Sequence, residues 1–234
     1  MQQATTALVI PVYNPLPDWE QLLYKRYTEL KNTLQQPLQL CIVNDGSANG
    51  LFHLAAQWLQ QQDANIRIIS FDVNEGKGAA LRKGLSAVEA DHYAFTDVDV
   101  PYTTDSAIAI INCIQTSTAD IAIGNRDRQY YKRISNFRAV LSKLVRFFIR
   151  HLMRIPFDDT QCGLKAFNKK GKQLFLSTTI NTYLFDMEFV LLSVRAKANI
   201  QTIPVELRSD IRLSRMPAGV LARELKNFLK LLFR

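Results

Sequence analysis

The sequence predicts one α/β domain in which helices flank a mainly parallel β-sheet. Two observations indicate this class. Short apolar segments alternate with segments of helical periodicity over residues 7–125, which is the pattern of β-α-β units. Hydrophobic residues also make up 47% of the 234 residues, enough for a substantial core. No repeat or linker divides the chain, so we expect a single domain over residues 1–217 and an amphipathic helix over residues 218–234.

The expected strands and helices alternate in chain order. Strands are predicted where short apolar runs are rich in β-branched residues, and helices where apolar positions recur three or four residues apart. Two prolines within residues 14–18 stop the first strand before the first helix begins. We expect strands over 7–13, 38–47, 65–71, 92–100 and 119–125, and helices over 19–34, 51–62, 76–88 and 106–116.

After about residue 130 the segments become longer and more basic. A long helix is predicted over 133–155, followed by a loop, a strand over 164–167 and a helical stretch that runs through 185–197. A strand over 200–207 precedes the final helix. The long helix and the final helix each combine an apolar face with lysines and arginines. Such helices either pack on a core or lie in a membrane interface, and both alternatives stay open.

The net charge of +8 indicates an anionic partner. Nucleic acid is not favoured, because no recognised binding motif accompanies the charge, and this leaves a phosphorylated substrate or an anionic membrane surface. No apolar run approaches the ~18 residues of a spanning helix, and the first residues do not resemble a signal peptide. Three widely spaced cysteines suit a reducing compartment. We therefore expect a cytoplasmic protein on the cytoplasmic face of a membrane.

Polar residues gather where the predicted strands end. Ligands bind outside the carboxyl ends of the strands in a parallel sheet, so these residues locate the candidate site. Asp97 and Asp99 follow an apolar strand and have no cation beside them in the sequence. Two such carboxylates suit Mg²⁺ or Mn²⁺, whose remaining ligands are phosphates and water. The alternative, which the spacing alone favours, is a polar turn in which Asp99 accepts backbone N–H bonds.

The glycine-rich stretch over residues 74–84 matches neither of two familiar phosphate-binding motifs. Gly78 follows Lys77 where a Walker loop needs Ser or Thr, and Leu81 stands where the dinucleotide fingerprint needs Gly or Ala. The stretch still opens a predicted helix, whose free N–H groups together with Lys77 favour an anion. A plain turn at a helix start is an equally good interpretation of these residues alone.

The order of several motifs carries more information than any one of them. IPVYN, VNDGS, NEGKGAALRKGL, TDVDVP, IGNR, DTQCGLKAF and FDMEF follow one another between residues 10 and 189. In these motifs the sequence resembles the family 2 glycosyltransferases, which have the GT-A fold, over about residues 7–215. Within that family it is most similar to the polyprenyl-phosphate sugar synthases, the dolichyl-phosphate mannose and dolichyl-phosphate glucose enzymes. The last two motifs resemble the glucose type.

The resemblance implies a nucleotide-sugar site and a divalent metal. Asp97 and Asp99 match the metal motif and would bind Mg²⁺ or Mn²⁺, with Asp99 as the stronger candidate for direct coordination and for catalysis. The residues implied in binding the nucleotide sugar are Pro11, Tyr13, Asp45, Lys77 and Asp97.

The resemblance also implies a site for the phosphate of a polyprenyl phosphate acceptor. Arg126 would take part in catalysis and in binding this phosphate. Arg138 and Ser142 match an Arg-x-x-x-Ser motif that would grip the same group. Asp159 would face the sugar as a further catalytic residue, and Glu188 would line the same pocket.

Three positions depart from the family pattern. Pro15 stands where the first motif usually has Glu, and Asn44 stands where the acidic turn normally has its first Asp. Pro101 occupies the position of a Gln near the metal in the mannose-type enzymes. A third side-chain ligand for the metal is therefore not expected.

The implied reaction is the inverting transfer of a hexose from a nucleotide sugar, such as UDP-glucose or GDP-mannose, to a polyprenyl phosphate. A phosphate acceptor is already ionised at neutral pH, whereas a sugar hydroxyl acceptor usually needs a general base. Two alternatives stay open: a glycosyltransferase that extends a glycan, and an inactive basic binding module. The acids that could supply a base are Asp158, Asp159, Asp186 and Glu188.

Overall fold

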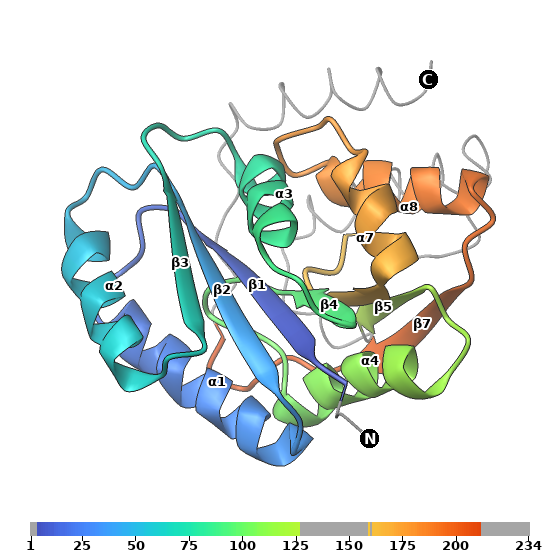
Figure 1. Ribbon diagram of the computed structural model, residues 1–234, viewed down its shortest axis with the longest axis horizontal. Helices are drawn as coiled ribbons and strands as arrows, with labels where there is room; N and C mark the ends of the chain where they lie inside the picture. The colour runs from blue at the N-terminus through green and yellow to red at the C-terminus, as the bar shows by residue number, and fades with distance from the viewer. Residues whose placement is uncertain (1–3, 127–158, 160, 212–234) are drawn as a thin grey trace.

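The computed structural model describes residues 4–126, 159 and 161–211. Within these residues one seven-stranded sheet has the order β3-β2-β1-β4-β6-β5-β7 (Figure 1). β6 is antiparallel to β4 and β5, and the other neighbouring strands are parallel. The expectation of a mainly parallel sheet is confirmed. The strands are β1 (Thr6–Val12), β2 (Leu38–Asp45), β3 (Ile66–Phe71), β4 (His92–Phe95), β5 (Ile121–Arg126), β6 (Lys165–Asn168) and β7 (Ile200–Val205).

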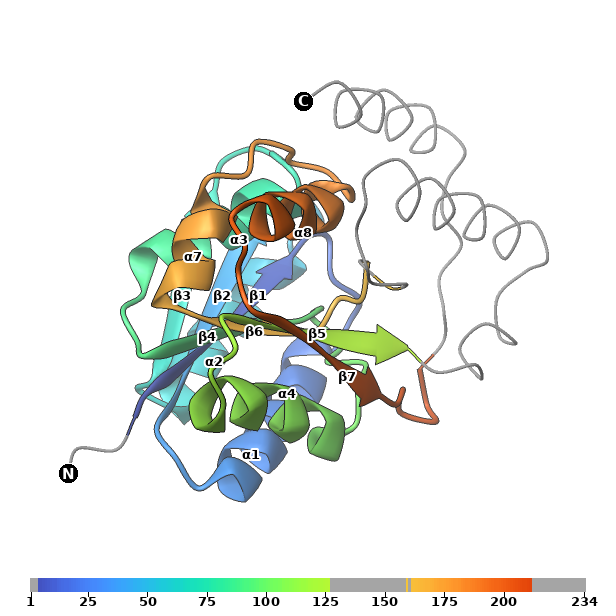
Figure 2. The same cartoon turned by 90° about the vertical axis from the view of Figure 1, so that its right-hand side faces the viewer.

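Helices cover both faces of the sheet. α1 (Trp19–Leu34), α2 (Leu51–Gln62) and α4 (Thr104–Thr116) lie on one face, and α3 (Lys77–Ala87), α7 (Lys169–Leu176) and α8 (Phe185–Arg195) lie on the other (Figure 2). Each face therefore has its own core. Successive strand residues point to opposite faces, so Leu8 and Ile10 of β1 pack in the first core, while Ala7 and Val9 pack in the second.

α1 and α2 begin and end at the predicted residues, but two other predictions are wrong. β4 ends at Phe95 rather than at residue 100, because the pairing with β1 and β6 stops at Phe95. The residues that follow form a turn in which the Val100 N–H donates to the Asp97 carbonyl at 2.9 Å. The single helical stretch predicted after β6 is two helices, α7 and α8, separated by residues 177–184.

Several predictions fall on other parts of the chain. The helices predicted over 133–155 and 218–234 lie outside the described residues, as do Arg138, Ser142 and Asp158. None of the helices that the structure describes has the length and apolar character needed to cross a membrane.

Candidate active site

The two aspartates after β4 lie in a turn, and Asp97 is paired with a cation from a distant part of the sequence. The Nζ of Lys77, the first residue of α3, donates to the Oδ1 of Asp97. Gly163 is also close, because a Cβ atom there would be 2.6 Å from the Asp97 Oδ2 and 4.0 Å from the Lys77 Nζ. Asp97 is thus held between α3 and the loop before β6, and Lys77 supplies a positive charge that its sequence neighbours lack.

Lys77 stays cationic in this position. Burial disfavours its charged form, but the attraction of the Asp97 and Asp186 carboxylates is greater and raises the pKa of Lys77. A charged ammonium at the carboxyl end of the sheet is suited to bind an anion, and the binding of a phosphate by Lys77 stays a prediction.

Asp99 sits in a strained segment of backbone. Its neighbour Val100 has a φ of 35°, a left-handed conformation that is costly for a β-branched residue. Arg26 of α1, which is 4% exposed, donates to the carbonyl oxygen of Asp99 and contacts that of Val100 at 3.5 Å. The same guanidinium donates to the Asp210 Oδ2 at 2.6 Å. A buried arginine therefore holds the turn through its backbone carbonyls. It does not bind the Asp99 carboxylate.

The two carboxylates form a donor set that suits Mg²⁺ or Mn²⁺. Burial raises the pKa of Asp99, and the negative charge of Asp97 raises it further, a repulsion that a divalent cation would relieve. Among the described residues, no group of three or more His, Cys, Asp or Glu could hold a metal ion. The described part of the chain thus offers two carboxylates here, and ions of this kind commonly complete their shell with substrate phosphates and water.

Asp45, at the end of β2, organises the glycine-rich turn. It is 2% exposed, and its carboxylate accepts from the Asn74 side chain at 2.8 Å, the Glu75 N–H at 2.8 Å and the Gly76 N–H at 3.0 Å. Burial raises the pKa of Asp45, and these bonds partly offset the rise. The structure thus gives Asp45 a role in shaping the turn, and its contact with a nucleoside stays a prediction.

The start of α3 differs from the prediction of free N–H groups. The Gly78 N–H donates to the Asn181 carbonyl at 2.7 Å, and a Cβ on Gly78 would lie 2.5 Å from the Ile180 carbonyl oxygen. A carbonyl of the segment between α7 and α8 therefore accepts this N–H, which is not free to bind a ligand. Lys77, rather than the helix terminus alone, is the group here that is suited to bind an anion.

Arg126, the last residue of β5, is paired with Asp159. The Arg126 Nε and NH2 donate to the two Asp159 oxygens, each at 2.6 Å, and the Arg126 N–H donates to the Oδ2 at 3.1 Å. Asp159 is 5% exposed. The expectation that Asp159 faces the sugar stays untested, but its carboxylate is directed at Arg126 and orients that guanidinium.

Glu188 does not line a pocket, and that expectation is wrong. It is 0% exposed, and its oxygens accept from the Thr179 N–H at 2.8 Å, the Thr179 hydroxyl at 2.9 Å and the Ile180 N–H at 2.7 Å. This carboxylate binds the loop between α7 and α8, the segment that interrupts the predicted single helix. Asp186 is buried as well, and the Lys165 ammonium donates to it at 2.7 Å.

The other residues predicted to bind the nucleotide sugar lie on or just after the first strand, and Asn44 lies in the acidic turn after the second. Pro11 pairs with Val43 of β2, and Tyr13 follows β1 with 52% of its surface exposed. Asn44 points to the face opposite Asp45, where its Oδ1 accepts from the Ser47 N–H at 3.0 Å.

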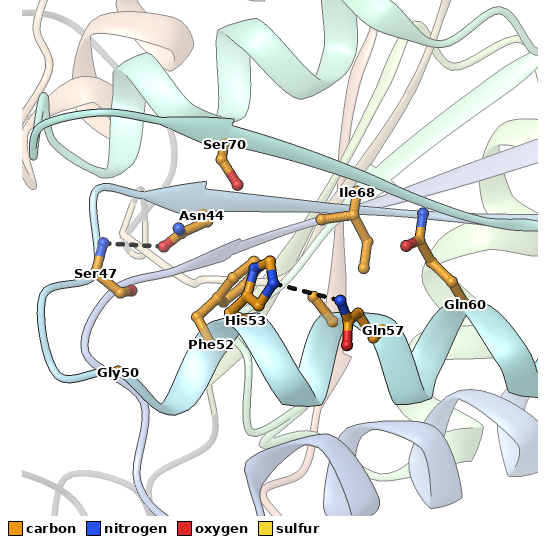
Figure 3. Close-up of a pocket in the computed structure, with 10 residues that line it drawn as sticks. Asn44, Ser47, Gly50, Phe52, His53, Gln57, Gln60, Ile68 and Ser70 are labelled. Atoms are coloured by element: carbon orange, nitrogen blue, oxygen red, sulfur yellow. Dashed lines mark hydrogen bonds between the residues drawn. The ribbon is translucent and has the colours of Figure 1, made fainter.

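Asn44 also lines a pocket of about 410 Å³ between α2 and the strands β2 and β3 (Figure 3). His53 and Gln57 of α2, bonded to each other at 3.3 Å, lie on its helical side. Asp97 and Asp99 are not among the residues that line this pocket. The pocket therefore reaches the acidic turn but does not include the two acids after β4.

Sequence reasoning missed two buried cations near the site. Arg26 follows the spacing of Leu23 and Leu30 on the buried face of α1, and Lys165 interrupts an apolar strand. A charge at a core position needs a partner, so each of these charged residues in an apolar pattern indicated a buried polar contact. Apart from the Cys162 carbonyl, three residues before Lys165, their partners are far away in the sequence and had no local signal.

Comparisons with known proteins agree with this architecture. The sequence profile of Glycosyl transferase family 2 matches residues 7–175. A dolichyl-phosphate beta-glucosyltransferase of Saccharomyces cerevisiae is 27% identical over 85% of the chain and 65% of that protein, and the human protein of the same name is 25% identical over 85% and 66%. The chain thus spans about 65% of the length of these relatives.

A solved structure shows the same fold. Glucosyl-3-phosphoglycerate synthase from Mycobacterium tuberculosis in complex with UDP superposes with a TM-score of 0.72 at 16% identity, covering 98% of this chain and 79% of that one. A likeness at this identity concerns the fold, which is the GT-A arrangement. Because the profile match covers well over half of the residues, the chain belongs to glycosyl transferase family 2.

Proposed function

We propose that the protein is an inverting glycosyltransferase that moves a hexose from a nucleotide sugar to a polyprenyl phosphate. The observation that carries the proposal is the convergence of Asp97, Asp99 and Lys77 at the carboxyl end of the sheet. Two carboxylates and one ammonium suit a nucleoside diphosphate with a divalent ion. The names of the relatives, dolichyl-phosphate beta-glucosyltransferases, support the lipid acceptor.

The donor would lie along the ends of β1, β2 and β4. Tyr13 is exposed beside the site and would contact the base or ribose, with Pro11 behind it. Asp45 would act by holding the turn that carries Lys77, and Lys77 would bind a donor phosphate. Mg²⁺ or Mn²⁺ held by Asp97 and Asp99 would offset the charge that develops on the leaving nucleoside diphosphate.

The acceptor would approach from the side of Arg126. Arg126 would hold its phosphate in an orientation fixed by Asp159, and Arg138 and Ser142 would complete the grip. A residue spacing of four places Arg138 and Ser142 on one face of the predicted helix. The guanidinium fork suits this task because it donates paired, charge-assisted hydrogen bonds to phosphate oxygens.

Three of the four acids that could supply a base lie in the described part of the chain, and their environments favour a phosphate acceptor over a sugar hydroxyl. Asp159 is bonded to Arg126, Asp186 to Lys165, and Glu188 to the loop over residues 179–180. Each of these acids already serves a contact within the protein, so none of the three is poised as a general base. An ionised phosphate needs no such base and attacks the anomeric carbon directly.

The test is a transfer assay over UDP- and GDP-sugars, with and without Mn²⁺, using a short-chain polyprenyl phosphate and an oligosaccharide as alternative acceptors. We expect metal-dependent transfer to the polyprenyl phosphate. Transfer to the oligosaccharide alone would establish the glycan-extending alternative. No turnover with any donor, and no effect of metal on nucleotide binding, would favour the basic binding module.

We also propose that the protein binds anionic membranes without spanning them. The basic amphipathic segments over 133–155 and 218–234 and the net charge of +8 support this. Co-sedimentation with vesicles should require anionic lipid and should weaken as salt is added. Removal of residues 218–234 should reduce binding if that helix is an anchor, and should mainly lower the melting temperature if it packs on the core.

A further inference from the structure

The protein buries two charges that the proposed mechanism does not use. Lys165 on β6 is 0% exposed, and Asp186 at the start of α8 is 5% exposed. The Lys165 Nζ donates to the Asp186 Oδ1 at 2.7 Å and to the Cys162 carbonyl at 2.6 Å. Apolar residues of related size often stabilise a fold as well as a buried ion pair does. A gain in stability is therefore a weak reason for this pair to be here.

Both members of the pair are linked to the groups that hold Asp97. Cys162, whose carbonyl binds Lys165, directly precedes Gly163, the residue that lies against the Asp97 Oδ2. Asp186 attracts the ammonium of Lys77, which donates to the Asp97 Oδ1. The Oδ1 of Asp97 thus accepts from a lysine that Asp186 attracts, and the Oδ2 lies near a glycine whose preceding residue is bound by Lys165.

We propose that Lys165 and Asp186 are positioning residues that hold the loop over 161–163 and Lys77 in place against Asp97. The inference rests on the proposed function, because it assigns the pair to the transfer reaction. Neither residue is placed to touch the substrate, since both are buried. They act by fixing where the Asp97 carboxylate lies relative to the donor, and a shift of about 1 Å at such a site lowers turnover by about a hundredfold.

The test replaces both charges at once. Lys165→Met combined with Asp186→Val leaves no unpaired charge in the core, so the melting temperature should stay close to that of the wild type. The matched control is Lys172→Met, which removes another buried lysine. Lys172 donates to the Val88 carbonyl at 2.8 Å and has no contact with the loop or with Asp97.

The first measurement does not depend on activity. Cys162 is 0% exposed and its thiol donates to the Tyr102 hydroxyl at 3.2 Å, so its alkylation reports opening of the loop. We expect the alkylation rate of Cys162, followed by peptide mass, to rise at least tenfold in the double variant. Cys41, buried elsewhere in the core, should keep its wild-type rate, and the control should change neither rate.

The second measurement is transfer by the same proteins. We expect kcat to fall about ten- to a hundredfold in the double variant and to stay unchanged in the control. Wild-type alkylation or wild-type kcat in a folded double variant would overturn the inference. If the wild type transfers no sugar at all, the proposed function fails, and the alkylation rate alone decides whether the pair holds the loop. If the double variant does not fold, Lys165→Gln combined with Asp186→Asn, which removes both charges at nearly unchanged size, carries both measurements.

Discussion

The acids after β4 and the acids of α8 share one chemistry but have opposite surroundings. The Asp97 side chain is 42% exposed, and burial with a neighbouring charge raises the pKa of Asp99, so this pair is open to a cation. Asp186 and Glu188 are buried, and each is bonded to donors within the protein. Asp97 has a cationic partner as well, so the comparison teaches that exposure, rather than pairing, separates an acid available to a ligand from one that supports the fold.

The largest effect should come from Asp99→Asn. If the pair after β4 holds a metal, losing one anionic ligand should cost several kcal/mol of transition-state stabilisation, or about a thousandfold in kcat/KM. The melting temperature should change little, because Arg26 holds the backbone carbonyl of Asp99 and not its carboxylate. The measurement is transfer at saturating Mn²⁺, with Asp105→Asn, an exposed acid on α4, as the control. Unchanged turnover would remove the metal assignment.

Arg138→Ala should rank next, since it probes a cation assigned to the acceptor rather than to the donor. Removal of a charge-assisted contact to a phosphate should lower transfer to a polyprenyl phosphate by about ten- to a thousandfold. Donor affinity, measured separately, should stay within about twofold because other motifs hold the nucleotide. Lys143→Ala, on the same predicted helix, is the control. An equal loss of donor binding would point to a shared pocket or to misfolding.

Glu188→Gln should separate support from chemistry within α8. The amide would set an N–H₂ group against donors that now bind a carboxylate oxygen, at a cost of about 2 kcal/mol in the free energy of unfolding. For a domain of this size the melting temperature should fall by about 4–8 °C. kcat below that temperature should stay within about threefold. A large loss of kcat without destabilisation would place Glu188 among the catalytic groups after all.

Thr103→Ala should give the smallest fall in melting temperature, and it serves as a reference for the effect of Glu188→Gln. The Thr103 Oγ1 caps α4 by accepting from the Ser106 N–H at 3.3 Å. Losing such a cap costs about 1 kcal/mol, which lowers the melting temperature by about 2–4 °C. Thr103→Ser should restore the wild-type value. A drop as large as that of Glu188→Gln would mean that stability alone does not distinguish supporting acids from ordinary caps.

The sequence predicted the mainly parallel sheet and the limits of α1 and α2, because these follow from local periodicity and turn residues. It did not predict that β4 stops at Phe95, since a strand ends where its partners end. It named Asp97 but not the pairing with Lys77, which lies 20 positions earlier. It placed Glu188 in the sugar pocket, because a motif identifies an acid without showing which donors bind it.

Gly163 illustrates what this means for substitution tolerance. It carries no functional group, yet any side chain there would press on a carboxylate that Lys77 already holds in place. In a scan of all substitutions, position 163 should tolerate as little change as position 97. Positions near this site that do not tolerate substitution therefore include residues constrained only by packing as well as residues that take part in the reaction. Residues should be assigned to the reaction by what they donate or accept, and not by how little they can vary.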